Sequence, residues 1–126
     1  MCRNQTREPF AMLDLQIPVI AAVNGPVIVH AELALLSDIV IASTTPIFTT
    51  ATLTTVYREL LGHNRSRYFI SMGEKIYAPG AKTLGVVSEV LPLDQLLDRT
   101  WEIARTKFLP KNRVQRRLAR SLWIQP

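Results

Sequence analysis

Two short, largely apolar segments place the strongest limit on how this chain can fold. One covers residues 18–23 (PVIAAV) and ends at the turn signal NGP, and the other covers residues 38–43 (DIVIAS). Continuous apolarity bounded by turn residues is typical of strands that are buried on both faces, as in parallel sheets. The residues between them, 31–37 (AELALLS), favour a short helix. We therefore expect a strand–helix–strand crossover at the centre of the fold.

The rest of the chain is dominated by helical patterns. We interpret residues 44–55, which are rich in threonine, as a strand end followed by a connecting loop. A strand is expected over 86–91, and helices are expected over 6–16, 53–61, 64–72, 79–85, 93–108 and 111–123. In the helix over 93–108 one apolar face is expected, from side chains at helical spacing: Leu96, Leu97, Trp101, Ile103 and Ala104. The pattern predicts an α/β fold with a helical C-terminal third.

Length and composition indicate a soluble protein with one core. The 126 residues fit a single compact domain, which we divide into a core over 1–110 and a basic C-terminal helix over 111–126. The lone cysteine, Cys2, excludes an internal disulfide, and the N-terminus shows no apolar signal-peptide core. No apolar run is long enough to span a bilayer. We therefore expect a cytoplasmic protein without a membrane partner.

Positive charge is concentrated near the C-terminus. The net charge is +5, and no acidic residue follows Glu102, whereas seven lysines and arginines lie between Arg105 and Arg120. We interpret this cluster as a solvated helix face. The alternative is contact with phosphate groups on a nucleic acid, a membrane surface or an anionic cofactor. Nucleic acid is the less favoured partner, because the segment has no interleaved aromatic residues apart from Trp123 and no known motif.

Two long segments resemble one enzyme family. Residues 18–43 (PVIAAVNGPVIVHAELALLSDIVIAS) and 60–92 (LLGHNRSRYFISMGEKIYAPGAKTLGVVSEVLP) are similar, in order, to the crotonase superfamily of enoyl-CoA hydratases and isomerases. The runs NGPVIVHAELALLSDIV and LGHNRSRYF resemble most closely the β-diketone hydrolases of the 6-oxocamphor hydrolase type. The resemblance implies a crotonase-like fold, of which this chain holds a part.

The resemblance also implies where a reacting carbonyl would be bound. Crotonases stabilise an enolate with backbone N–H groups, and such preorganised donors are usually the largest catalytic contribution. The matching segment here contains Val29, His30 and Ala31 as candidate oxyanion and substrate-binding residues. His30 stands where hydratases carry glycine and diketone hydrolases carry histidine, and it is the first candidate catalytic residue. The alternative for His30 is a packed histidine beside a helix start.

Much of the catalytic machinery that the resemblance implies has no counterpart. Glu32 matches the first of the two glutamates that activate water in hydratases, and it is the second candidate catalytic residue. The second glutamate is expected at position 52, where the chain has Thr52, and no acidic residue lies between Asp38 and Glu59. The segment after Phe48 also lacks the His and Asp pair of the diketone hydrolases. An alternative for Glu32 is stabilisation of the first turn of a helix.

These absences leave two interpretations of function. One is a truncated hydrolase-like or hydratase-like protein with weak or no activity alone, acting on a small carbonyl compound or an acyl-CoA. The other is a non-catalytic crotonase-fold module that assembles with full-length homologues or with copies of itself. We expect no metal and no bound cofactor, although a coenzyme A thioester is a candidate substrate.

Overall fold

A three-stranded parallel sheet lies at the centre of the computed structural model, which describes residues 11, 14–28, 31–49 and 54–124. Its strands are β1 (Ile20–Val23), β2 (Ile39–Ser43) and β5 (Glu89–Leu91), in the order β1-β2-β5, and both pairs are parallel. Helix α2 (Ala31–Leu35) connects β1 to β2. The strand–helix–strand unit expected from the sequence is therefore confirmed, and the whole is an α/β fold with a helical C-terminal third. The expectation that the first strand is buried on both faces was wrong, because Ala22 of β1 is exposed, whereas β2 is buried over Val40–Ser43.

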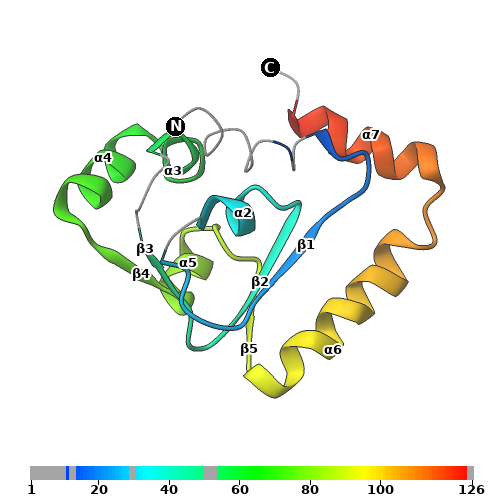
Figure 1. The fold of residues 1–126 in the computed structure, drawn as a ribbon, viewed down its shortest axis with the longest axis horizontal. Coiled ribbons are helices and arrows are strands. Elements are labelled where there is room, and N and C mark those ends of the chain that lie inside the picture. The colour runs from blue at the N-terminus through cyan, green and yellow to red at the C-terminus, as the bar shows by residue number, and fades with distance from the viewer. Residues whose placement is uncertain (1–10, 12–13, 29–30, 50–53, 125–126) are drawn as a thin grey trace, which may run out of the picture.

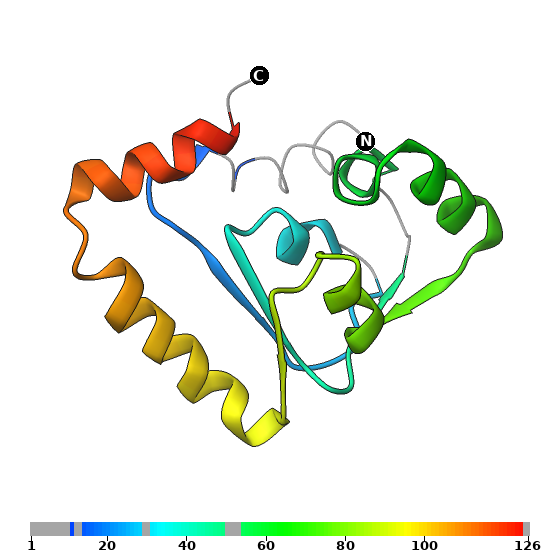
Figure 2. The same cartoon turned by 180° about the vertical axis from the view of Figure 1, so that it is seen from behind.

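Helices surround this sheet on two sides (Figure 1). Besides β5, the elements after β2 are β3 (Ile47–Thr49), α3 (Thr54–Leu61), α4 (His63–Met72), β4 (Lys75–Tyr77), α5 (Ala78–Thr83), α6 (Leu93–Ile103), η2 (Ala104–Phe108) and α7 (Arg113–Ile124). A lobe formed by α3, α4 and α5 lies at one side of the sheet, and the arm formed by α6 and α7 lies at the other, as the view from behind also shows (Figure 2). The helix expected over 6–16 lies largely outside the described residues.

A second, antiparallel strand pair was missed by the sequence analysis. The segment expected as a strand end and loop contains β3, which pairs with β4 from Ile47 opposite Tyr77 to Thr49 opposite Lys75. Each strand has only three residues, so neither shows a resolvable alternation of apolar and polar side chains. The central residue, Phe48, is fully buried, which attaches this pair to the core.

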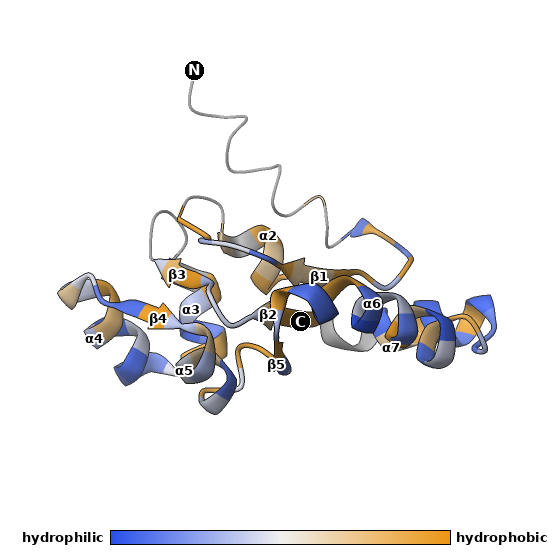
Figure 3. Ribbon diagram, turned by 90° about the horizontal axis from the view of Figure 1, so that it is seen from below, coloured by the Kyte–Doolittle hydropathy of each residue, from blue (hydrophilic) through white to orange (hydrophobic). Residues whose placement is uncertain are grey.

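The long C-terminal helix differs from the expected one in two ways. Its α-helical part ends at Ile103, and the next five residues form the π-helix η2. Leu96 and Ile103 are buried against Ile41 of β2, whereas Leu97 and Trp101 are 62% and 54% exposed. The expected apolar face is therefore confirmed at Leu96 and Ile103, but the expectation was wrong for Leu97 and Trp101. Hydrophilic and hydrophobic residues intermingle along α6 and α7, in contrast with the apolar strands β1 and β2 (Figure 3).

Candidate functional site

The segment that leads into α2 is held by hydrogen bonds to β3. The backbone N–H of Val27 donates to the carbonyl of Ile47 at 2.9 Å, and the N–H of Thr49 donates to the carbonyl of Val27 at 3.2 Å. The hydroxyl of Thr49 donates to the carbonyl of Ile28 at 2.9 Å. The two residues that precede the candidate site are therefore fixed to the antiparallel strand pair.

The far side of the same segment is fixed by burial. Ala31, the first residue of α2, is 3% exposed and belongs to the main hydrophobic core. The backbone of Glu32 lies in α2, but its side chain is outside the described part of the chain, as are Val29 and His30. Of the candidate residues, only Ala31 therefore has a described environment.

An aromatic pair on α3 and α4 contacts β3. The phenol of Tyr57 on α3 donates a hydrogen bond to the carbonyl of Thr49 at 3.0 Å. The Tyr57 ring packs against the ring of Phe69 on α4 with centroids 5.2 Å apart, and both side chains are buried. Helices α3 and α4 are thereby connected to the strand that holds the candidate segment. This role could not be predicted from the sequence, because no local pattern identifies the carbonyl to which a tyrosine hydroxyl donates.

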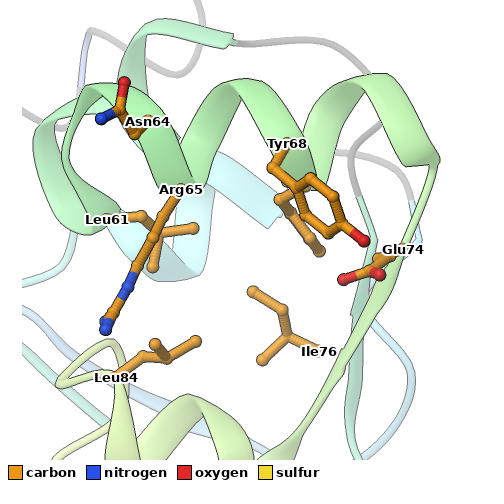
Figure 4. Close-up of a pocket in the computed structure, with 8 residues that line it drawn as sticks. Leu61, Asn64, Arg65, Tyr68, Glu74, Ile76 and Leu84 are labelled. Carbon is orange, nitrogen blue, oxygen red and sulfur yellow. The ribbon is translucent and has the colours of Figure 1, made fainter.

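A separate apolar pocket of about 370 Å³ lies in the lobe of α3, α4, β4 and α5. Arg65 and Asn64 lie at one end of it, Tyr68 and Glu74 lie at the other, and aliphatic side chains form its floor (Figure 4). None of the described residues that line it belongs to the segment 27–32. Ala31, the candidate residue whose environment is described, is therefore not part of this pocket.

A buried ion pair connects the C-terminal helix to the sheet. A guanidinium N–H of Arg120 on α7 donates to the carboxylate of Asp38, which also accepts the backbone N–H of Val19 at 2.7 Å. Arg120 is only 2% exposed. This contradicts the interpretation of the whole basic cluster as a solvated face, because its last member is inside the protein. A hollow of about 650 Å³ between α3 and α7 has this pair in its wall.

A second ion pair joins α6 to β5 near the surface. The Arg99 guanidinium donates twice to the Glu89 carboxylate, at 2.9 Å each, and once to Glu102 at 2.8 Å. The hydrogen bond from Arg99 lowers the pKa of Glu89 below its ordinary value, although partial burial opposes the shift. The bond with Glu89 in turn raises the pKa of Arg99. The arrangement stabilises the packing of α6 and indicates no chemistry.

Neither a cluster of metal ligands nor a membrane-spanning helix occurs within the described ranges. No group of three or more His, Cys, Asp and Glu side chains gathers there as a metal site would require. In the same residues, every helix is too short or too polar to span a bilayer.

Comparison with known proteins agrees on one family. The family model described as enoyl-CoA hydratase/isomerase matches residues 4–121. A curated relative, the probable enoyl-CoA hydratase echA12 of Mycobacterium tuberculosis, is 31% identical over an alignment that covers 80% of this chain and 44% of that protein. The chain therefore spans less than half the length of this curated relative.

Solved structures extend the comparison to the fold. A β-diketone hydrolase from the cyanobacterium Anabaena sp. PCC 7120, solved with (S)-3-oxocyclohexyl acetic acid bound, matches with a TM-score of 0.82 and 36% identity. The match covers 90% of this chain and 50% of the hydrolase. An enoyl-CoA hydratase/isomerase from Cupriavidus metallidurans CH34 matches with a TM-score of 0.85 and 28% identity, over 94% of this chain and 48% of that one.

Proposed function

Because the chain belongs to the enoyl-CoA hydratase/isomerase family, we propose that it contributes part of a carbonyl-polarising site of the β-diketone hydrolase type. The observation that carries this proposal is its 36% identity over 90% of its length to a β-diketone hydrolase. In this proposal, backbone N–H groups of Val29, His30 and Ala31 bind the substrate oxygen. The His30 side chain donates a further hydrogen bond to a carbonyl. The substrate is a cyclic β-diketone, and an acyl-CoA thioester is the alternative.

The contacts around the segment support an oxyanion site. Donors stabilise a developing oxyanion best when they are held in place before the reaction, so that no reorganisation is needed. Val27 and Ile28 are tied to β3 on one side of the segment, and Ala31 is buried in the core on the other. The described residues on both sides of the segment are therefore held in place, which supports the proposal of preorganised donors.

The distribution of carboxylates favours a hydrolase over a hydratase. Hydration through two glutamates needs a base and an acid with separated pKa values. Glu32 supplies one carboxylate, Thr52 stands where the second is expected, and no acidic residue lies between Asp38 and Glu59. A histidine at position 30 can polarise a carbonyl without a second carboxylate. Because no His and Asp pair follows Phe48, we propose that turnover by this chain alone is weak or absent.

Steady-state assays of the purified chain test the proposal. Cyclohexane-1,3-dione derivatives and crotonyl-CoA are offered in parallel, and cleavage or hydration is followed spectrophotometrically. We expect slow cleavage of the diketone that is lost in His30→Ala and retained in Glu32→Ala. His63→Ala is the matched control, because His63 is an exposed histidine at the start of α4. Crotonyl-CoA hydration at ordinary enzymatic rates that depends on Glu32 would refute the proposal.

A second candidate function is assembly with full-length homologues. The observation that favours it is an exposed apolar stripe on α6, formed by Leu93, Leu97 and Trp101 at intervals of four residues. Adjacent apolar side chains of this size on a helix face are typical of protein–protein contacts. Size-exclusion chromatography with a full-length homologue, using wild type and Leu97→Gln, tests it. Assembly that Leu97→Gln abolishes supports this function, and a soluble monomer in every mixture opposes it.

A further inference from the structure

A third pocket, distinct from the α2 segment, lies at the base of the C-terminal arm. It has a volume of about 340 Å³, is open to solvent on one side, and is lined by the residues before β1, by β1 itself, by the end of α6 with η2, and by α7. Its apolar lining includes Ile17, Ile20, Trp101 and Phe108, of which Ile17 and Trp101 are more than half exposed. The volume falls in the lower part of the range of about 300–1,000 Å³ that is typical of small-molecule sites. The arm lies across the molecule from α4 (Figures 1 and 2).

Two arginines from different helices line this apolar pocket. Arg105 comes from η2, and its guanidinium carbon lies 5.7 Å from the centre of the Trp101 ring. Arg116 comes from α7 and is half-buried. None of the described residues that line the pocket is acidic. The local charge is therefore positive, and an anion entering the pocket would meet two guanidinium groups beside an aromatic face.

The backbone at the pocket is itself unusual. Residues 104–108 form a π-helix, in which the N–H of Leu109 donates to the carbonyl of Ala104, five residues earlier, at 3.0 Å. Single π-helical turns are rare and occur frequently at functional sites. Here the turn carries Ala104, Arg105 and Phe108, all of which line the pocket. This observation is independent of the charge and points to the same place.

We propose that this pocket binds a small amphiphilic carboxylate. Its apolar body lies against Trp101, Ile20 and Phe108, and its carboxylate lies between Arg105 and Arg116. Guanidinium groups bind carboxylates through charge-assisted hydrogen bonds, which are stronger than neutral ones. A ligand with an apolar body can contact the aliphatic and aromatic side chains of the pocket, whereas a bare inorganic anion cannot. The proposal does not depend on catalysis at the α2 segment.

Titration with octanoate tests the proposal, with octan-1-ol as the neutral compound of the same chain length. In a Trp123→Phe background Trp101 is the only tryptophan, so its fluorescence reports occupancy of the pocket. We expect saturable octanoate binding, and binding of octan-1-ol about tenfold weaker, because a hydrogen bond to a charged group is lost. Raising the ionic strength should weaken octanoate binding and leave octan-1-ol binding unchanged.

Variants at the two arginines locate the carboxylate. Arg105→Gln and Arg116→Gln should each weaken octanoate binding about tenfold, measured by calorimetry as well as fluorescence. Arg67→Gln is the matched control, because Arg67 is an exposed arginine on α4, which is distant from the pocket. Circular dichroism checks that each variant is folded. If a variant does not fold, the ionic-strength comparison in the wild type still decides whether the site selects the anion.

Several results would overturn the proposal. These are the absence of saturable binding, equal affinities for octanoate and octan-1-ol, and a loss of affinity in Arg67→Gln as large as in the pocket variants. Binding to phosphatidylserine vesicles is measured as well, with phosphatidylcholine vesicles as the neutral control. Binding to the anionic vesicles without binding of monomeric octanoate would show that the basic arm meets a membrane surface, which contradicts the proposal.

Discussion

Arg120 and Asp38 are 82 positions apart in the sequence, yet they form one ion pair that joins the last helix to the central sheet. The same Asp38 oxygen accepts the backbone N–H of Val19, just before β1. The Asp38 carboxylate therefore contacts both the segment before β1 and helix α7. Asp38 itself directly precedes β2. Because the Arg120 side chain is 2% exposed and that of Asp38 is 21% exposed, water screens the pair only weakly.

Replacing Arg120 with methionine tests this connection. Removing one partner of a buried ion pair typically costs about 3 kcal/mol or more, because the other charge stays behind in a poorly solvated place. We expect Arg120→Met to lower the free energy of unfolding by about that amount, measured by urea denaturation. Arg117→Met, an exposed neighbour on α7, should change it by less than about 0.5 kcal/mol. Equal effects of the two variants would mean that the pair contributes little.

The hydroxyl of Thr49 should control the rigidity of the candidate site. Thr49→Val keeps the shape of the side chain but removes the hydrogen bond to the Ile28 carbonyl, which contributes about 1 kcal/mol. We expect amide hydrogen exchange at the start of α2 to become about fivefold faster. Thr83→Val removes a comparable hydroxyl bond, to the Pro79 carbonyl in α5, and serves as the control. Unchanged exchange in Thr49→Val would contradict the proposed anchoring.

Two glycines should respond in opposite directions to alanine. Gly73 ends α4 with φ at 63°, in the left-handed region, where a Cβ costs about 1–2 kcal/mol. Gly80 lies inside α5 without a positive φ, and an added Cβ would meet only Ile76 Cγ2, at 3.9 Å. We expect Gly73→Ala to destabilise the protein by about 1 kcal/mol and Gly80→Ala to be neutral or stabilising by up to about 1 kcal/mol. Thermal and urea unfolding of both variants check this.

The Glu89–Arg99 pair should give a small dependence of stability on pH. Because Arg99 lowers the pKa of Glu89 in the folded state, the folded protein binds this proton less readily than the unfolded chain. The contribution is therefore fully present above the ordinary glutamate pKa of about 4.3 and is lost as the pH falls through the lower folded value. Both side chains are about one-third exposed, so we expect less than about 1 kcal/mol.

A Glu89→Gln variant isolates that dependence. Urea unfolding of wild type and variant is compared between pH 7 and pH 3. The difference in stability between them should shrink as the pH falls, because a protonated Glu89 and the glutamine that replaces it both lack the charge that Arg99 binds. A difference that stays constant or grows on acidification would show that another interaction of Glu89 is responsible.

The core of the fold could be predicted from the sequence because its signals are local. The run over 18–23 is apolar throughout, and the run over 38–43 is apolar between Asp38 and Ser43, so strands were expected there. The structure confirms them as the parallel pair β1 and β2. The positions of α3, α4 and α5 were also close to those expected, since glycines such as Gly73 set their ends. The family resemblance rested on these same segments, and the family model matches across them.

The features that the sequence did not determine depend on partners far along the chain. Strand β3 has three residues and exists because β4 pairs with it, and no local pattern encodes that contact. Helical spacing placed Leu97 and Trp101 in one apolar set with Leu96 and Ile103. The sheet covers only the face that carries Leu96 and Ile103.

Charge and amphipathic pattern by themselves described the C-terminal segment only as a basic helix. Tertiary structure decided that Arg120 is buried on Asp38, while Arg105 and Arg116 line a pocket. The physical reason is general. Hydrophobic periodicity specifies which segments become helices and strands, but the burial of a particular charge depends on whether packing places an opposite charge beside it.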